Sequence, residues 1–443
     1  MKAGVTPTSA RRRPARRAFA RLPSSLLPSS LLPSSLLPFS LLPSLLLAGV
    51  AGQASAALPM PEISGSVRAL ADLRTANRDS PLAPAGALLG AGRDCGVGEL
   101  RLRGSLAGVT AAGQALAQSC DPGGVDRDGR LDELFWEGGK GAWHVTLGKK
   151  VLAWDVGYGF RPLDVIQKEL RRALIDQQLE GVPVAMLEHF GASTSTGLVL
   201  TNIGRSDTDT GRDEQAAVVR GYGQWGSVDA YGLARWGMQE RASLGAAAAW
   251  VPTNALEVHA SARWGQRATR LVSTWTQNLP LVQDDPWSDA VGGAFWQALA
   301  GTQWTGENKV SVLGEIWYDG TAPSDSDWDA WQARNASIQQ FVFAPQQARA
   351  GNLAWQAQGL SRQNLRRVSM LGRVAYTGGT WQPALDALYN PADGGSTLTA
   401  SLGWQGDQLR IDAGLRGYFG PHSALLRQLP DRAIAYAAVT LPF

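Results

Sequence analysis

The amino-acid sequence predicts an all-β fold, a transmembrane antiparallel up-and-down β-barrel of about 18 strands, with 16 as the alternative count. Three observations predict it. Apolar and polar residues alternate with period two beyond residue 62, tight and long connections alternate along the chain, and the composition includes 17 Trp and 51 Gly. Trp and Tyr form belts at both membrane interfaces of such barrels, and Gly suits closely approaching, curved strands.

Residues 1–56 are predicted to be a signal peptide that precedes a barrel over residues 57–443. Lys and Arg, without any Asp or Glu, come before a Leu-rich stretch, and Ala54 and Ala56 supply a small-residue site, so we expect cleavage after about Ala56. Without this segment, 34 basic residues face 38 acidic ones, a net charge of −4. The basicity therefore belongs to the export signal, and we expect no nucleic-acid partner.

Period-two alternation is clearest over residues 256–264 and 409–419, where one face is apolar and the other carries charges of both signs. A strand between lipid and a polar lumen needs this pattern. Strands are predicted over residues 63–72, 98–106, 109–118, 131–137, 142–150, 185–191, 195–203, 215–226, 228–238, 244–250, 255–266, 291–304, 309–318, 367–376, 381–389, 396–404, 408–418 and 432–443.

The lengths of the connections favour a membrane barrel over a soluble Trp-rich sandwich, the alternative for alternating strands. Tight turns at 107–108, 138–141, 226–227, 305–308, 377–380 and 405–407 are separated by long connections at 73–97, 151–184, 267–290 and 319–366. Outer-membrane barrels have this asymmetry, with short periplasmic turns and long extracellular loops. No stretch after Ala56 offers about 18 uninterrupted apolar residues, so no transmembrane helix is predicted.

The two cysteines and the last strand carry further predictions. Cys95 and Cys120 are equidistant from the turn at 107–108, so they lie opposite each other at the open end of a hairpin, and we expect a disulfide there. The chain ends at Phe443, with Leu441 and Val439 at alternate positions before it. Such a terminal strand resembles the signal by which the barrel-assembly machinery selects its clients, so these three residues are predicted to form an assembly signal.

The stretch GKKVLAWDVGYGFRPLD, residues 148–164, follows an acidic and aromatic strand and precedes a short helix that we expect over residues 165–179 of an outer loop. It resembles the signature G-[RK]-[QK]…W…G-x-x-P-x-D of outer-membrane barrels of the alginate-export type and related porin-like families. The places of that signature are filled here by Gly148, Lys149, Lys150, Trp154, Gly159, Pro162 and Asp164. The resemblance implies an eighteen-stranded barrel that passes an anionic polysaccharide through a basic lumen.

The alternation places charges of both signs in the predicted lumen, which departs from a purely basic one. The predicted pore-lining residues are Arg101, Arg103, Lys150, Glu257, Arg263, Glu315, Arg373, Arg410, Asp412 and Arg416. Opposed charges brace neighbouring strands, and a basic excess in a narrow pore concentrates anions; both effects can operate together.

These features predict an outer-membrane channel of the porin-like kind, for diffusion or export of small polar or anionic solutes. Its expected partners are outer-membrane lipid, lipopolysaccharide, the barrel-assembly machinery and the solute, and no cofactor is predicted. The alternatives are a barrel enzyme of the outer-membrane phospholipase type and a structural or interaction barrel whose lumen its own loops close.

Candidate catalytic and metal-binding residues are few. His259 and Ser261 share a strand face as in outer-membrane phospholipases, but the sequence reveals no third residue to orient the histidine, so no enzyme is predicted. Residues 126–132 resemble part of a calcium loop, but Gly124 and Phe135 occupy the positions that need ligands, so no metal is predicted.

The longest connection, 319–366, mixes acidic residues with Trp328 and Trp331. We expect a helix over residues 325–341 whose Trp side chains stack on sugars or fold inward to constrict the pore.

Overall fold

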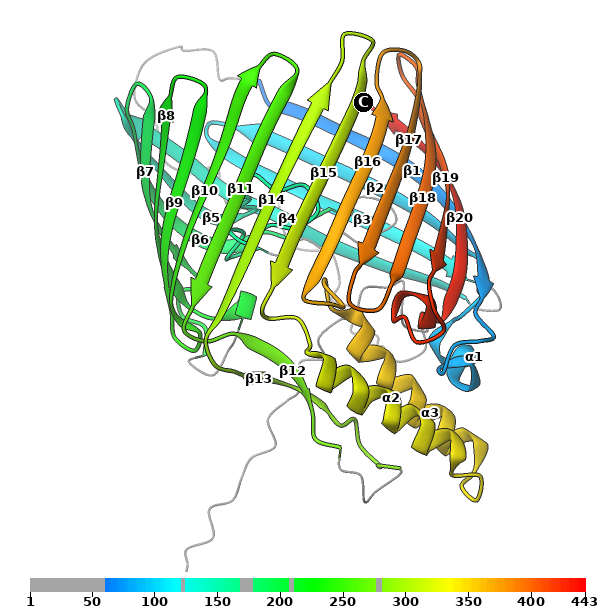
Figure 1. The fold of residues 1–443 in the computed structure, drawn as a ribbon. Helices are drawn as coiled ribbons and strands as arrows, with labels where there is room; N and C mark the ends of the chain where they lie inside the picture. The colour runs from blue at the N-terminus through cyan, green and yellow to red at the C-terminus, as the bar shows by residue number, and fades with distance from the viewer. Residues whose placement is uncertain (1–59, 121–123, 168–177, 207–210, 276–280) are drawn as a thin grey trace, which may run out of the picture.

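The strands close into a single barrel in the computed structural model, which describes residues 60–120, 124–167, 178–206, 211–275 and 281–443 (Figure 1). Eighteen antiparallel strands each pair with their neighbours in chain order, and β1 pairs with both β2 and β20 to complete the ring. The predicted fold class is therefore confirmed. The predicted signal peptide, 1–56, lies outside the described residues.

The strands of the barrel agree with the predicted segments to within a few residues at most ends. They are β1 (Glu62–Ala76), β2 (Cys95–Leu106), β3 (Val109–Cys120), β4 (Val125–Lys140), β5 (Trp143–Lys150), β6 (Val182–Phe190), β7 (Thr194–Thr201), β8 (Ala216–Trp225), β9 (Val228–Gly237), β10 (Arg241–Thr253), β11 (Leu256–Gly265), β14 (Phe295–Thr305), β15 (Val310–Asp319), β16 (Val368–Tyr376), β17 (Trp381–Asn390), β18 (Gly395–Gln405), β19 (Arg410–Phe419) and β20 (Asp431–Pro442).

The two ends of the barrel differ in their connections. At one end, here called the turn end, short hairpins join the strands, and the first and last strands begin and finish there (Figure 1). The β2–β3 hairpin turns at Ala107 and Gly108, whose φ angles are 51° and 82°. Two consecutive positive φ angles are those of a type I′ turn, which matches the twist of paired strands. The other end, here called the loop end, carries the long connections.

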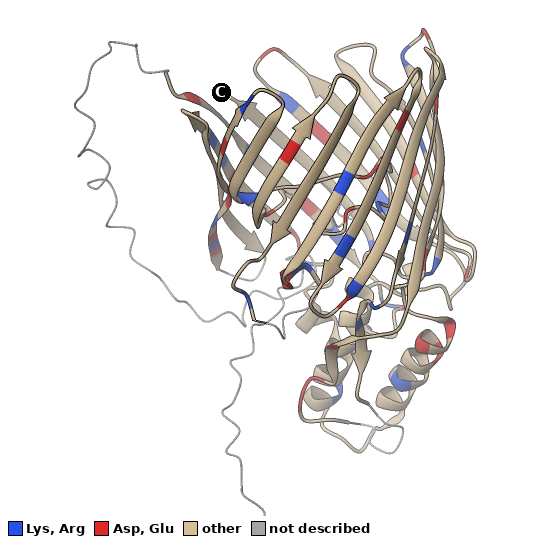
Figure 2. Cartoon of the chain, turned by 90° about the vertical axis from the view of Figure 1, so that its left-hand side faces the viewer, with Lys and Arg blue, Asp and Glu red and all other residues tan. Residues whose placement is uncertain are grey.

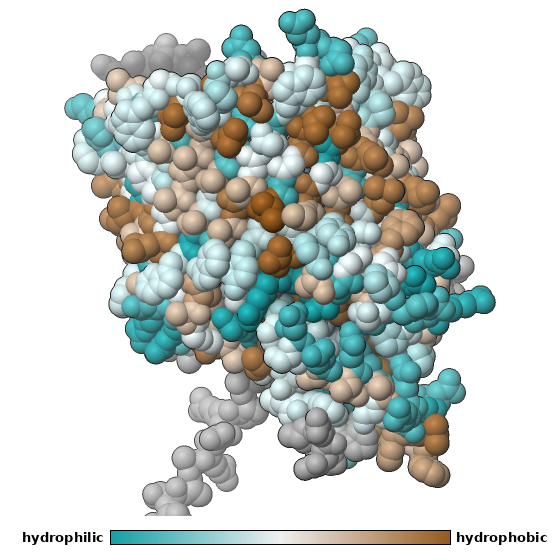
Figure 3. All heavy atoms as spheres, viewed as in Figure 1, coloured by the Kyte–Doolittle hydropathy of each residue, from teal (hydrophilic) through white to brown (hydrophobic). Residues whose placement is uncertain are grey.

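The outer wall of the barrel carries many exposed apolar side chains, which are brown on the face shown in Figure 3. Two rings of exposed aromatic side chains border it. Toward the turn end the exposed ring comprises Trp136, Trp143, Trp225, Trp250, Trp304, Tyr376 and Trp381; toward the loop end it comprises Trp236, Trp264, Trp296, Tyr389 and Phe419. Trp296 and Trp304 both lie on β14, and eight residues of a tilted strand span roughly 20 Å along the barrel axis. This spacing suits the hydrocarbon layer of a bilayer. Among the described residues, no helix is long and apolar enough to cross a membrane.

A helical subdomain lies at the loop end of the barrel, below the strands in Figure 1. It comprises η2 (Ala83–Ala85), α1 (Gly86–Leu89), the hairpin β12 (Thr269–Ser273) and β13 (Trp287–Val291), α2 (Asp325–Gln340), α3 (Gln346–Gln356), η4 (Ala357–Ser361) and η5 (Leu426–Gln428). Its core joins residues of three connections, including Leu82, Leu353 and Leu425. The subdomain therefore ties the first, last and longest connections together.

Trp328 and Trp331 are buried in this core, with 2% and 3% of their surfaces exposed. Trp328 Nε1 donates a hydrogen bond to the carbonyl of Leu365 at 2.6 Å, and Trp331 Nε1 donates one to Gln356 at 2.9 Å. The helix over 325–341 was correctly predicted to within one residue, but the suggested roles were wrong. Because both indoles are packed and hydrogen-bonded inside the subdomain, they neither stack on sugars nor constrict the pore.

Parts of two other predicted connections, before residue 131 and over 267–290, form strands. β4 already begins at Val125, so Asp126 and Asp128 pair with Gln118 and Leu116 of β3 and do not lie in a loop. The hairpin β12–β13 lies within the predicted connection 267–290. Of the helix predicted over 165–179, residues 168–177 lie outside the described residues.

Candidate functional site in the barrel lumen

Residues 151–167, here called the lumenal segment, run through the interior of the barrel instead of remaining at the loop end. Leu163 and its neighbours pack against inward-facing side chains of β6 to β10, among them Val199 and Val218. Phe160 packs against Trp317 of β15 and is bordered by side chains of β16 and β17. β6 and β17 lie half-way round the ring from each other. The segment therefore crosses the lumen and divides it.

Two buried carboxylates fold the lumenal segment onto itself. Asp155 accepts a hydrogen bond from Leu163 N at 2.5 Å, and Asp164 accepts one from Trp154 N at 2.7 Å. Burial raises the pKa of the Asp155 carboxyl, and it raises the pKa of Asp164 to about 6. Asp164 belongs to the predicted signature, and in this chain it closes a turn inside the barrel.

Glu315 fastens the lumenal segment to the wall. Its two carboxylate oxygens accept hydrogen bonds from Tyr158 N and Gly159 N, both at 2.6 Å, and His259 Nε2 lies 2.9 Å from Oε1. Glu315 is 4% exposed. It points inward, as the alternation predicted, but it is covered by the segment and does not line an open passage.

His259 thus has the third residue that the sequence did not reveal, because Glu315 lies two strands away in the sheet. The arrangement does not favour an esterase. Ser261 is 4% exposed and faces the barrel interior, so an ester in the surrounding lipid has no access to its hydroxyl. Among the described residues, no group of three or more His, Cys, Asp or Glu is arranged to hold a metal ion.

Arg263 also differs from its predicted place. Its guanidinium is buried beside the ring of Phe295, with a 5.2 Å separation, and donates to Ser243 Oγ at 3.3 Å. Although the alternation predicted its inward direction correctly, Arg263 is covered by packed side chains and does not line an open passage.

The remaining inward charges form ion pairs in which the cation is usually the more exposed partner. Positive and negative residues are interspersed along the strands (Figure 2). The side-chain exposures of the cation and of its carboxylate are 51% and 8% for Arg103–Glu133, 28% and 3% for Arg101–Glu99, 19% and 3% for Arg68–Glu99, 31% and 23% for Arg373–Asp386, and 45% and 32% for Arg410–Asp412. Lys150–Glu137 reverses the order, with 24% and 45%. The pairs brace the wall, and most present a guanidinium to the lumen.

Two more of the predicted pore-lining residues, Arg416 and Glu257, contact a threonine and a histidine respectively. Arg416 Nε donates to Thr399 Oγ1 at 2.8 Å. Glu257, whose side chain is 40% exposed, lies 3.5 Å from His259 Nδ1. Both therefore lie on the inner surface near the charged residues described above.

A cavity of about 220 Å³ lies on the part of the wall formed by β1 to β4. Its lining includes Arg101, Arg103, Asp132 and Ser66. The apolar contacts of the lumenal segment lie on β6 to β17. The cavity therefore lies on a side of the lumen that these apolar contacts do not fill, and it is bordered by the exposed Arg103.

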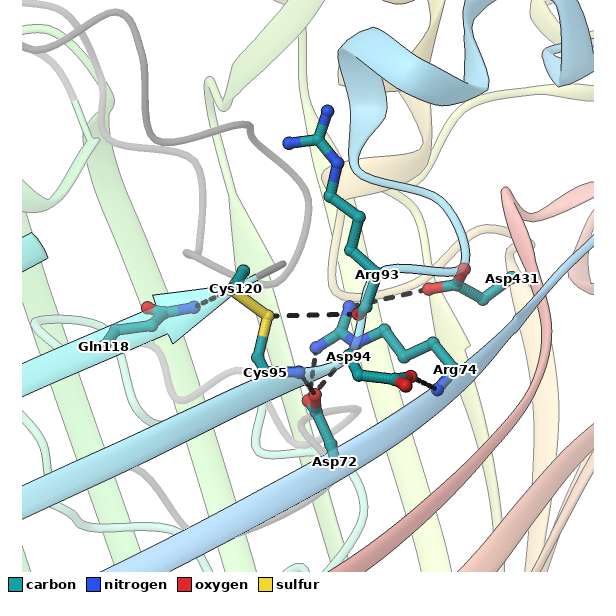
Figure 4. The surroundings of a disulfide bond; sticks show 8 residues. All are labelled: Asp72, Arg74, Arg93, Asp94, Cys95, Gln118, Cys120 and Asp431. Atoms are coloured by element: carbon teal, nitrogen blue, oxygen red, sulfur yellow. Dashed lines mark hydrogen bonds and ion pairs between the residues drawn. A yellow bond between two sulfur atoms is a disulfide. The ribbon is translucent and has the colours of Figure 1, made fainter. Parts of the chain in front are cut away.

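The predicted disulfide and terminal residues lie next to the strands that close the ring. Cys95 and Cys120 are directly paired across β2 and β3 and form a disulfide, with a Cα–Cα distance of 4.2 Å. Beside it, Arg74 forms ion pairs with Asp72 and with Asp431 of β20 (Figure 4).

At the turn end, Phe443 exchanges two backbone hydrogen bonds with Gly65, of 2.8 and 2.9 Å. Val439 and Leu441 are 38% and 49% exposed, and they pair with Ala69 and Val67 of β1. All three terminal residues therefore belong to the closing seam between β20 and β1.

Comparisons with known proteins bear on the fold. No family model matches the sequence, and no curated protein matches it. Among solved structures, the chain is similar to OccK5 (OpdH) of Pseudomonas aeruginosa, with a TM-score of 0.51 and 10% identity over 87% of this chain and 99% of that chain. It is also similar to OccK8 (OprE) of the same organism, with a TM-score of 0.50 and 8% identity over 86% and 98%. At these identities the likeness establishes that this chain shares their fold.

Proposed function

We propose that this protein is an outer-membrane channel for small polar and anionic solutes. The observation that carries the proposal is the difference in exposure within the lumenal ion pairs. Arg103 is 51% exposed while its partner Glu133 is 8% exposed, and the cation is the more exposed partner in four further pairs. The inner surface therefore offers positive groups to a passing solute although its formal charges are mixed. Fixed positive charge in a narrow, low-dielectric passage raises the local concentration of anions.

The apolar wall and its two aromatic rings support a membrane location. With the turn end in the periplasm and the loop end outside, the helical subdomain faces the extracellular medium, and the wall contacts lipid and lipopolysaccharide. The terminal residues Val439 and Leu441 lie on the last strand and Phe443 directly follows it, where the barrel-assembly machinery would recognise them. Cleavage of a signal peptide after about Ala56 completes this proposed route.

The experiment is planar-bilayer recording of the refolded protein. We expect single-channel steps and, under a salt gradient, a reversal potential of the sign that shows anion preference. Silence in the bilayer would favour the loop-closed structural barrel, and a reversal potential showing cation preference would contradict the charge argument. Ester hydrolysis that is lost in Ser261→Ala would favour the enzyme instead.

The finer resemblance, to alginate-export barrels, rests on the motif at 148–164. Its residues in this chain fold the lumenal segment: Gly159 N donates to Glu315, and Asp164 accepts from Trp154 N. A segment that crosses the lumen favours small solutes over a polysaccharide chain. Conductance block by short uronate oligomers, absent with monomers, would support the polysaccharide alternative.

A further inference from the structure

Three residues on adjacent strands form one cross-strand row under the lumenal segment. His259 of β11 pairs with Gly301 of β14, and Gly301 pairs with Glu315 of β15. The histidine and the glutamate are therefore two strands apart, yet His259 Nε2 lies 2.9 Å from Glu315 Oε1. We call His259, Gly301 and Glu315 the clamp.

Gly301 makes this contact possible because it has no side chain. A Cβ atom placed there would lie 2.4 Å from His259 Nε2 and 2.7 Å from Glu315 Cγ. Both distances are far below van der Waals contact, so any side chain at 301 would push the two partners apart. In contrast, Gly314, the neighbour of Glu315 in the chain, has no atom within 4 Å of a built Cβ.

The clamp holds the part of the lumenal segment directly before Phe160, which packs against Trp317. Glu315 accepts the N–H groups of Tyr158 and Gly159, one with each oxygen, at 2.6 Å. Hydrogen bonds to an ionised acceptor are the strong ones, and two on one carboxylate also fix its orientation. A Cβ at Gly159 would lie 2.7 Å from Leu371 Cδ2 and 3.0 Å from Glu315 Oε2, so a side chain here would displace these atoms.

Fixing Tyr158 N also fixes where its side chain lies. The ring of Tyr158, a residue that is 41% exposed, lies 5.6 Å from the guanidinium of Arg373 on β16. Arg373 is paired with Asp386 of β17. The clamped backbone therefore extends an aromatic side chain from the segment toward one of the exposed lumenal cations.

We propose that His259, Gly301 and Glu315 are positioning residues that hold Tyr158 against Arg373 and thereby set the width and the anion preference of the passage. This inference rests on the proposed channel function. Its structural part, the retention of the segment by the clamp, is measurable without any conductance.

The test compares wild-type protein with Glu315→Gln, Glu315→Ala, His259→Phe and Gly301→Ala, and uses Gly314→Ala as the matched glycine control. Folding is checked by far-UV circular dichroism. Amide hydrogen exchange then reports on the Tyr158 and Gly159 amides, and single-channel recording reports on the passage. We expect exchange in Glu315→Ala to be faster on the order of a hundredfold, and less so in Glu315→Gln, which keeps one acceptor oxygen. The wild-type conductance level should be lost and replaced by a larger one with weaker anion preference.

The outcomes separate the clamp from the channel. If Glu315→Ala and His259→Phe leave both amide exchange and conductance unchanged, the clamp is refuted while the channel stands. If exchange rises but conductance and selectivity stay at wild-type values, the role in the passage is refuted. If wild-type protein conducts nothing while exchange rises in the clamp variants and not in Gly314→Ala, the proposed function fails and the clamp itself is supported.

Discussion

Replacing Arg103 and Arg410 together by Gln should remove the two most exposed of the paired lumenal arginines, which lie on β2 and β19, on either side of the closing seam. Their side chains are 51% and 45% exposed, more than those of the other paired arginines described above. Gln keeps much of the side-chain length and polarity, so the change is chiefly one of charge. The partner carboxylates Glu133 and Asp412 remain, which makes the local field more negative.

The expected magnitude follows from Coulomb's law. A unit charge roughly 8 Å from a passing anion, with an effective dielectric constant of about 40, contributes about 1 kcal/mol. Screening at about 0.1 M salt, where the Debye length is about 10 Å, reduces this to about 0.5 kcal/mol for each arginine. Two arginines therefore change the entry of an anion by about fivefold, since about 1.4 kcal/mol corresponds to tenfold.

The measurement is the reversal potential under a potassium chloride gradient, at low and high ionic strength. The anion-to-cation permeability ratio should fall by about fivefold or more at about 0.1 M and change little at about 1 M, where the Debye length is about 3 Å. The control is the pair Arg78→Gln and Arg127→Gln, since both residues are exposed and neither belongs to the predicted lumenal set. An unchanged ratio at low salt, or an equal change in the control, would refute the assignment of the passage.

Three further predictions concern the segment, the chain end and the disulfide. Burial raises the pKa of Asp164 to about 6 from an ordinary value of 3.8 and also raises the pKa of Asp155, so the docked segment loses stability as pH rises through that window. Amide exchange over 151–167, corrected for its intrinsic pH dependence, should be slower at pH 4 than at pH 7, and Asp164→Asn should reduce the difference, which Asp155 alone would then maintain. Deleting Phe443 removes two backbone hydrogen bonds to Gly65, worth about 1 kcal/mol each. Membrane insertion in cells should therefore fall far more than the resistance of the refolded barrel to urea. Normal insertion of the truncated protein would contradict the assembly signal. Changing Cys95 and Cys120 to Ser removes the disulfide between residues separated by 25 positions. Because the unfolded chain is then less constrained, the free energy of unfolding of the refolded protein, measured with urea, should fall by about 3.5 kcal/mol.

The barrel wall was predictable because each strand carries its own evidence. On β19, Leu415 faces lipid and Arg416 faces the lumen, and that alternation is legible without knowledge of the neighbouring strands. The alternation predicts which way a side chain points, but it does not predict whether other parts of the chain cover that side chain. Arg263 and Glu315 point inward as predicted, yet the sequence holds no local sign that other parts of the chain cover them.

The site was less predictable because its parts meet only in three dimensions. The lumenal segment has no strand or helix period, and it is held by apolar contacts to β6 to β10 and β14 to β17, which are distant in sequence. His259 and Glu315 meet because Gly301 lies between them in the sheet. The signal that was available was the glycine itself, a residue without a side chain in a strand of larger ones. The short hairpin β12–β13 was missed because it lies within a long connection and contributes nothing to the barrel wall.

The closing seam has a consequence for how the protein is removed from a membrane. β1 and β20 are joined along eleven register pairs, from Ser66 to Ala76, with Arg74 and Asp431 linked at one end and Gly65 and Phe443 at the other. Parting these strands in hydrocarbon would leave backbone groups without water to replace their partners, at several kcal/mol each. Separation of one strand after another within the bilayer is therefore strongly unfavourable. Degradation would then begin at the connections outside the hydrocarbon layer or after extraction of the intact barrel.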